Sequence, residues 1–157
     1  MRLKLKPKDL AKHLAFGKAQ AVARRFKNAV VIAADTFLVF RGRLLGKPRS
    51  RREAKRMLEA LSGKAHSVVT GFALMDTASG AAITEAVESR VYFRKLDPRE
   101  IAAYVASGEP LDKAGAYGIQ GLGGIFVKKI EGDYFNVVGL PIGVLVKRLR
   151  EFGVRVL

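Results

Sequence analysis

The sequence contains no cysteine and no tryptophan, and it carries only 14 acidic residues against 29 lysines and arginines. The lack of cysteine excludes disulfides, thiolate catalysis and cysteine-ligated metal clusters, and it is typical of a reducing compartment. No apolar run reaches the length of a membrane-spanning helix, and the N-terminus alternates lysine with leucine instead of forming the apolar centre of a signal peptide. We therefore expect a cytoplasmic protein with no membrane partner.

The excess of basic residues gives a formal net charge of +15, which favours polyanionic partners. Nucleic acids and nucleotide phosphates both belong to this class. The basic residues are spread through every segment, without a dense tail or repeated basic and aromatic interleaving. This distribution disfavours nucleic acid as the partner, although a basic nucleic-acid-binding protein stays an alternative.

A continuous apolar run from Ala29 to Ala34 leads directly into Asp35 and Thr36. The run is rich in β-branched residues and lacks helical periodicity, which predicts a strand buried on both faces in an α/β sheet. Ligands of such sheets bind outside the carboxyl ends of the strands, so Asp35 and Thr36 fall where a site is expected. The alternative is that Asp35 only caps a turn, and the strand by itself does not separate the two interpretations.

The rest of the chain alternates helical and extended patterns, and its 157 residues have the size of a single domain, residues 1–157. Capping signals and apolar periodicity predict helices over residues 7–26, 50–61, 97–108 and from 141 onward. Strands are predicted over residues 66–76, 81–93, a segment ending at 130, 134–138 and 154–157. A hairpin is expected over 37–45, with its turn at Arg41 and Gly42.

Three lysines are candidates for phosphate contacts. Lys18 lies at the flank of an apolar helical stripe, where the ordinary interpretation is a solvated surface lysine. Lys47 follows a glycine in Leu45–Pro48, a pattern that allows the backbone to approach a ligand while the ammonium contacts phosphate. Lys113 lies in a long glycine-punctuated segment, residues 108–121, whose N–H groups could approach an anion.

The same segment contains Gln120, whose side-chain amide both donates and accepts hydrogen bonds and could read the edge of a base. A flexible lid without a binding role is the alternative for this segment.

Seven short motifs follow one another in this sequence: Ala34–Thr36, Leu45–Pro48, Leu61–Gly63, Val69–Gly71, Gly108–Glu109, Asp112–Gly121 and Asn136–Pro141. In order and spacing, from about Leu14 to the C-terminus, they resemble the Maf family of nucleoside triphosphate pyrophosphatases. The resemblance implies an α/β fold like that of the inosine triphosphate pyrophosphatases, with a mixed twisted sheet flanked by helices and two lobes around a central cleft.

The resemblance also implies the chemistry, which is hydrolysis of a nucleoside triphosphate to the monophosphate and pyrophosphate with a divalent cation, Mg²⁺ or alternatively Mn²⁺. Asp35 matches the family's proposed proton acceptor, and we assign the metal to the same carboxylate. Lys18, Lys47 and Lys113 match basic residues of the cleft.

The base preference is also carried over by resemblance. Thr36 and Gln120 match the branch of the family that prefers dTTP and UTP, so these two residues are expected to contact the base of the substrate.

The sequence departs from the family pattern ahead of Lys18. Family members open with a strand leading into Ser-Pro-Arg-Arg, which this sequence does not contain. We expect reduced activity, because a lysine point charge does not replace bidentate arginine–phosphate hydrogen bonds. A catalytically impaired nucleotide-binding or interaction module of the same family is therefore an alternative. We also expect an uncovered strand edge, which either forms a homodimer through Val30–Thr36 or is covered by Met1–Lys6, the second being favoured by the alternation of leucine with basic residues.

Overall fold

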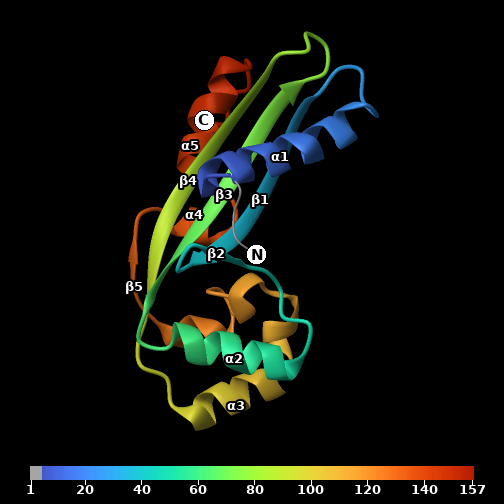
Figure 1. Ribbon diagram of the computed structural model, residues 1–157. Helices are drawn as coiled ribbons and strands as arrows, with labels where there is room; N and C mark the ends of the chain where they lie inside the picture. Colours follow the sequence, from blue (N-terminus) through green and yellow to red (C-terminus); the bar gives the residue numbers. More distant parts are fainter. Residues whose placement is uncertain (1–4) are drawn as a thin grey trace.

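The β-branched runs form a five-stranded sheet with the order β2-β1-β3-β4-β5. The computed structural model describes residues 5–157 (Figure 1). The strands are β1 (Val30–Phe40), β2 (Arg43–Leu45), β3 (Ala65–Asp76), β4 (Ala82–Phe93) and β5 (Val127–Glu131). Helices flank the sheet, which confirms the α/β class. Every pair of described strands is antiparallel, whereas a mixed sheet was expected.

Five α-helices and three short 3₁₀ helices complete the described chain. The α-helices are α1 (Pro7–Ala23), α2 (Arg51–Leu61), α3 (Pro98–Ala106), α4 (Tyr134–Val138) and α5 (Ile142–Glu151). The 3₁₀ helices are η1 (Glu109–Asp112), η2 (Ala114–Ala116) and η3 (Leu122–Phe126). Among residues 5–157, no helix combines the length and the hydropathy needed to cross a membrane.

Local capping decides where several helices begin. The predicted caps are confirmed, because the Ser50 hydroxyl accepts from the Glu53 N–H and the Asp97 carboxylate accepts from the Arg99 N–H. The strand predicted over 134–138 is wrong: the Asp133 carboxylate accepts from the Phe135 N–H and starts α4 there. The strand predicted over 154–157 is also absent, and that segment has no regular structure.

Strand β1 differs from its predicted form in two ways. It continues through Asp35 to Phe40, so Asp35 neither ends the strand nor caps a turn. The strand is also not buried on both faces, since Val31 is buried whereas Ile32 is 45% exposed. Helix α5 packs on Phe72 and Leu74 of the neighbouring strand β3, so it covers the centre of the sheet more fully than it covers β1.

Alternate residues of β3 supply the cores on the two faces of the upper part of the sheet, where α1 and α5 lie on opposite sides (Figure 1). Ala73 packs with Ala15 and Ala19 of α1, whereas Phe72 and Leu74 pack with α5. Helices α2 and α3 and the 3₁₀ helices gather at the other end of the sheet. This arrangement gives the two lobes that the family resemblance implies.

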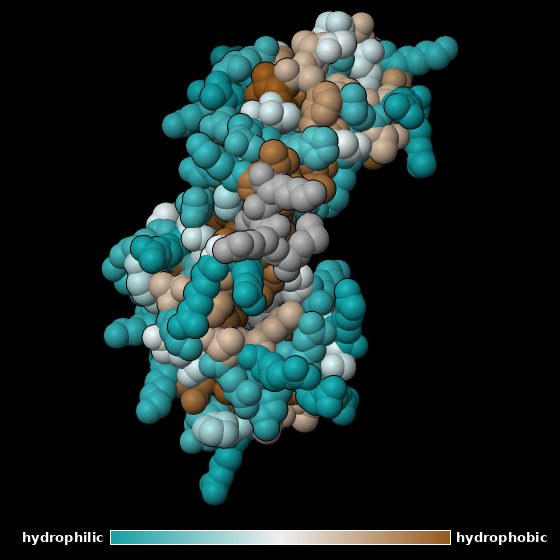
Figure 2. All heavy atoms as spheres, viewed as in Figure 1, coloured by the Kyte–Doolittle hydropathy of each residue, from teal (hydrophilic) through white to brown (hydrophobic). Residues whose placement is uncertain are grey.

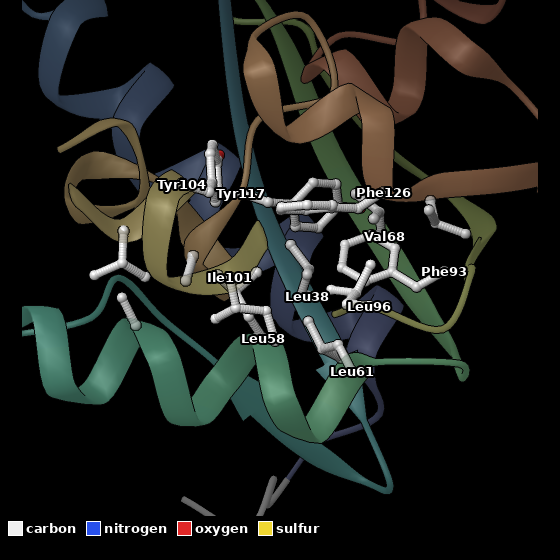
Figure 3. Packing of buried hydrophobic residues seen from close by; sticks show 14 residues of the cluster. Leu38, Leu58, Leu61, Val68, Phe93, Leu96, Ile101, Tyr104, Tyr117 and Phe126 are labelled. Atoms are coloured by element: carbon white, nitrogen blue, oxygen red, sulfur yellow. The ribbon is translucent and has the colours of Figure 1, made fainter. Parts of the chain in front are cut away.

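The largest buried cluster fills this second lobe (Figure 3). It joins Leu58 and Leu61 of α2 to Ile101 of α3, and Leu38 extends into it from β1. Strand β1 therefore contributes to the cores of both lobes.

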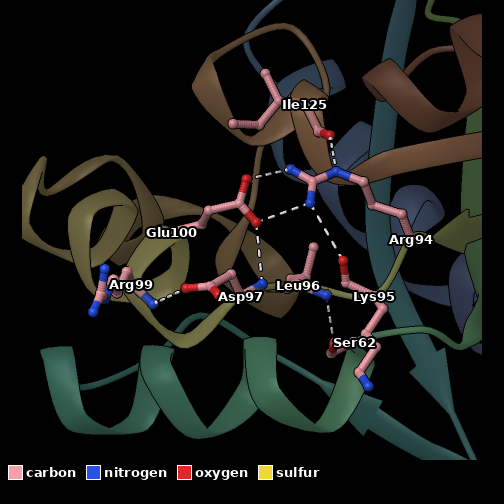
Figure 4. A network of polar contacts seen from close by, with 8 residues as sticks. All are labelled: Ser62, Arg94, Lys95, Leu96, Asp97, Arg99, Glu100 and Ile125. Carbon is pink, nitrogen blue, oxygen red and sulfur yellow. Dashed lines mark hydrogen bonds and ion pairs between the residues drawn. The ribbon is translucent and has the colours of Figure 1, made fainter.

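A polar network ties the end of β4 to α3 and η3 (Figure 4). The Arg94 guanidinium donates to both Glu100 oxygens, at 2.7 and 2.9 Å, and its Nε donates to the Ile125 carbonyl at 2.9 Å. The hydrogen bonds from Arg94 lower the pKa of Glu100 to about 2. Glu100 also accepts from the Asp97 N–H at 3.1 Å, so the same carboxylate completes the N-terminal cap of α3.

Helix α1 approaches β3 closely because position 71 is glycine. A Cβ on Gly71 would lie 2.2 Å from the Ala11 carbonyl group. We expect Gly71→Ala to lower the free energy of unfolding by about 2–3 kcal/mol, because the obstructing atoms are backbone atoms that cannot rotate away. The control is Gly17→Ala on the exposed face of α1, where nothing lies within 4 Å; it should stabilise the protein by about 1 kcal/mol. Urea denaturation measures the free energy of unfolding of both variants. Equal values for Gly71→Ala and the unmodified chain would contradict the packing argument.

His66 is buried in the second lobe, with Nε2 2.8 Å from the Tyr117 hydroxyl and its ring edge-on to Phe93. Burial lowers the pKa of His66 to about 4. The unfolded chain takes up the proton near pH 6.5, whereas the folded chain resists it until about pH 4, so stability is lost as the pH falls through this window.

The loss attributable to His66 should be roughly 3 kcal/mol. The free energy of unfolding of His66→Gln should therefore depend less on pH between 6.5 and 4 than that of the unmodified chain. The exposed His13→Gln variant is the control and should keep the full dependence. If the free energy of unfolding of His66→Gln depends on pH as strongly as that of the unmodified chain, His66 is not the cause of the loss of stability.

Candidate active site

The register between β1 and β3 decides which face each predicted site residue occupies. Asp35 lies opposite Gly71, and Thr36 lies opposite Thr70. Since successive side chains of a strand point to opposite faces, Asp35 shares the face covered by α1, and Thr36 faces the other side. The neighbouring residues agree: Phe37 packs with Ala11 of α1.

On the α1 face, Lys18 and Asp35 form an ion pair. Lys18 Nζ contacts Asp35 Oδ1 and also donates to the Ala34 carbonyl at 3.3 Å. Lys18 lies on α1 next to Ala15 and Ala19, which are buried against the sheet, whereas its own side chain is 56% exposed. The Asp35 side chain is 22% exposed, so a ligand can still reach the carboxylate. Lys18 is thus a largely exposed lysine, as the ordinary interpretation expects, and it is also paired with Asp35.

On the other face, a cavity of about 280 Å³ opens between the lobes. Four predicted residues line it: Thr36, Lys47, Lys113 and Gln120. Its apolar walls come from Leu38 and Val68 of the sheet and from Val137 and Val138 of α4. The structure thus divides the predicted site into two groups, one on each face of β1.

Lys47 and Lys113 line one cavity because a backbone contact joins their segments. The Gly115 N–H donates to the Gly46 carbonyl at 3.0 Å, which holds residues 45–48 against η2. Gly115 has a φ of 69°, and a Cβ there would lie 2.3 Å from Leu38 Cδ2, so glycine is required at this contact.

Asp112 is a cavity residue to which the sequence analysis gave no role. Both of its oxygens accept from Lys113 Nζ, at 2.8 and 2.9 Å. The hydrogen bond from Lys113 lowers the pKa of Asp112, and the charge of Lys47 adds to the effect. Asp112 therefore neutralises part of the positive charge of the cavity. Its position directly before Lys113 in the glycine-rich segment was the available signal.

A carboxylate holds the segment that carries Gln120. Glu109 accepts from the Tyr104 hydroxyl at 2.9 Å and from the N–H groups of Leu122 and Gly123 at 2.9 and 3.2 Å. Burial alone would raise the pKa of Glu109, but these hydrogen bonds lower it overall. A Cβ on Gly121 would lie 2.4 Å from a Glu109 oxygen, which explains a glycine there. The segment is thus folded around Glu109, and is not an open loop.

Thr36 belongs to a partly buried hydroxyl network. Its Oγ1 lies 2.8 Å from Thr70 Oγ1 and 3.3 Å from the Gly139 carbonyl. The Thr70 hydroxyl donates to the Asn136 carbonyl at 2.9 Å. The Asn136 amide in turn donates to the Val68 carbonyl and to Ser89 Oγ, so α4 is fastened to the sheet beside Thr36. The sequence analysis quoted the motifs that contain these residues without assigning Thr70 or Asn136 a role.

The described residues contain no cluster of three or more histidine, aspartate or glutamate side chains able to hold a metal ion. Any divalent cation at this site would therefore depend on few protein oxygens, as Mg²⁺ does when it is held by one or two carboxylates and by substrate phosphates.

The fold and the cavity define an α/β protein of two lobes with lysines, a threonine and an amide facing one pocket. A family model described as Maf-like protein matches residues 2–152. The chain belongs to the Maf family.

Several similar proteins are named dTTP/UTP pyrophosphatase. The one from Syntrophomonas wolfei is 48% identical over 151 residues, which cover 96% of this chain and 80% of the relative. The one from Bacillus anthracis is 50% identical over 150 residues, or 96% of this chain and 78% of the relative. The one from Dictyoglomus turgidum is 48% identical over 147 residues, which cover 94% of this chain and 76% of the relative.

We expect Glu109→Gln to raise KM for the nucleotide about tenfold, because the amide NH₂ faces backbone donors that the carboxylate now satisfies. The control is Glu59→Gln on α2, where the exposed carboxylate has only a 3.9 Å contact with Lys55. Steady-state kinetics measures KM, and thermal denaturation shows whether the fold is retained. An unchanged KM would show that Glu109 does not shape the cavity.

Proposed function

We propose that this protein hydrolyses dTTP and UTP to the monophosphate and pyrophosphate. The observation that carries the proposal is that one cavity is lined by Thr36, Lys47, Lys113 and Gln120, while Asp35 and Lys18 form an ion pair on the opposite face of β1. Relatives with about half of their aligned residues identical are named dTTP/UTP pyrophosphatases. A cytoplasmic location is part of the proposal, in keeping with the absence of cysteine.

The four predicted residues that line the cavity are assigned to different parts of the substrate. Thr36 and Gln120 contact the base, and Lys47 and Lys113 contact the phosphates. A nucleotide that also reaches Asp35 and Lys18 passes along the outer edge of β1. From Val30 to Phe37 this edge pairs with no other strand among residues 5–157.

The edge was expected to be covered by Met1–Lys6 or by a second copy of the chain. Met1 to Lys4 lie outside the described residues. Leu5 and Lys6 form no strand and lead directly into α1. A homodimer through Val30–Thr36 stays a proposal.

Asp35 is proposed to accept the proton of the attacking water. The water oxygen bonds to phosphorus as the α,β-phosphoanhydride bond breaks, and pyrophosphate leaves with the bridging oxygen. Lys18 stabilises the charge of the phosphates and keeps Asp35 oriented before the substrate binds. The lysines of the cavity offset the negative charge that gathers on the leaving group.

A divalent cation, Mg²⁺ or alternatively Mn²⁺, is also proposed. The partly exposed Asp35 carboxylate in a lysine-rich setting fits a cation that arrives with the triphosphate, since such ions keep phosphate oxygens and water as their other ligands. When bound, the cation supplies charge neutralisation at the phosphates. The alternative function is a nucleotide-binding module without turnover, which would use the same cavity.

We expect Asp35→Asn to lower kcat for metal-dependent pyrophosphate release from UTP at least about 100-fold, because the amide cannot accept the proton of water. The fold should persist, since Asp35 lies at a partly exposed position. The control is Asp9→Asn on α1, which removes an exposed carboxylate that pairs with Lys12. Full turnover by Asp35→Asn would refute its catalytic role, and no turnover by the unmodified chain would favour the binding module.

A further inference from the structure

The Thr36 hydroxyl has one proton to donate, and the protein offers two acceptors for it. One is Thr70 Oγ1 at 2.8 Å, and the other is the Gly139 carbonyl at 3.3 Å. The Thr70 hydroxyl also has one proton, and its acceptors are Thr36 Oγ1 and the Asn136 carbonyl at 2.9 Å.

The contact between the two threonines can form in two directions. In the first, Thr36 donates to Thr70 and Thr70 donates to the Asn136 carbonyl. In the second, Thr70 donates to Thr36 and Thr36 donates to the Gly139 carbonyl. The first has the shorter contacts. In the first arrangement the proton of Thr36 is used inside the protein and only lone pairs of its oxygen face the cavity, whereas in the second its proton is held only by the 3.3 Å contact with the Gly139 carbonyl.

We propose that Thr70 is a positioning residue that makes Thr36 an acceptor, so that the cavity selects pyrimidines with an N–H at ring position 3. Uracil and thymine carry this donor, whereas the same atom of cytosine is an acceptor. The inference rests on the proposed function, because it takes the cavity as the base site. It deepens that function by assigning the choice between UTP and CTP to a residue that does not line the cavity.

The surroundings hold Thr70 in this role. It is fully buried in the centre of β3 and lies directly opposite Thr36 in the register. Its acceptor belongs to Asn136, which is also fully buried and is anchored through its amide to Val68 and Ser89. Gln120 is exposed at the rim, and its amide can accept from or donate to the groups on either side of position 3. Discrimination at position 3 therefore falls to Thr36.

The test measures equilibrium binding in EDTA, where metal-dependent turnover does not occur. UTP, CTP and 3-methyluridine triphosphate are titrated into the unmodified chain, and UTP should bind about tenfold more tightly than either analogue, since each leaves the Thr36 oxygen without a donor. Thr70→Val removes the closer acceptor and leaves the Thr36 proton only the 3.3 Å contact with the Gly139 carbonyl, from which the acceptor atom of cytosine can draw it, so the ratio of UTP to CTP affinity should fall toward one. Thr70→Ser keeps the hydroxyl and should restore the ratio.

Thr84→Val is the matched control, because this threonine is exposed on β4 and should leave the ratio unchanged. Equal affinity of the unmodified chain for UTP and both analogues would overturn the inference, and so would failure to bind any of them. These titrations use the unmodified chain, so they test the inference even if Thr70→Val does not fold. Selective binding of UTP without pyrophosphate release would support the inference and refute the proposed function. Pyrophosphate release without selectivity for UTP would support the proposed function and refute the inference.

Discussion

The alternation of side chains along β1 is the constraint on which the site depends. The strand runs through both lobes, and its pairing with β3 sets Asp35 against Gly71 and Thr36 against Thr70. One face therefore carries a carboxylate under a helix, and the other carries a hydroxyl in a cavity. A shift of the register by one residue would exchange these environments and leave neither group with its partners.

The cavity is built by contacts between segments that are far apart in the chain. The Gly115 N–H reaches the Gly46 carbonyl, and Glu109 gathers the N–H groups of residues 122 and 123. These contacts use backbone groups, which explains why glycines are frequent there: a side chain at Gly115 or Gly121 would occupy the space of the contact itself. The positive charge of the cavity is also partly balanced within the protein, because Asp112 pairs with Lys113 before any nucleotide binds.

The sequence predicted those features that depend on neighbouring residues. The caps at Ser50 and Asp97 are local signals, and both are confirmed. The strand predicted at 134–138 failed because the β-propensity of its residues was outweighed by the cap at Asp133 and by the burial of Asn136 against the sheet. The division of the site between two faces could not be predicted, because the rule for parallel strands placed Asp35 at a strand end and the antiparallel register was not known. Thr36, Lys47, Lys113 and Gln120 line one cavity, whereas Lys18, which the family resemblance grouped with Lys47 and Lys113, pairs with Asp35 on the other face of β1.

The contact between Gly71 and Ala11 has a consequence for how this protein family can vary. The Ala11 backbone rests on the sheet at the residue directly opposite Asp35, and the same helix carries Lys18 two turns further along. The height of α1 above the sheet thus sets the reach of the ammonium toward the carboxylate. A larger residue at position 71 would lift the helix and lengthen that reach, so relatives that vary there would need a compensating change at position 11 or 18. Inheritance of these three positions is expected to be coupled, although they lie far apart in the chain.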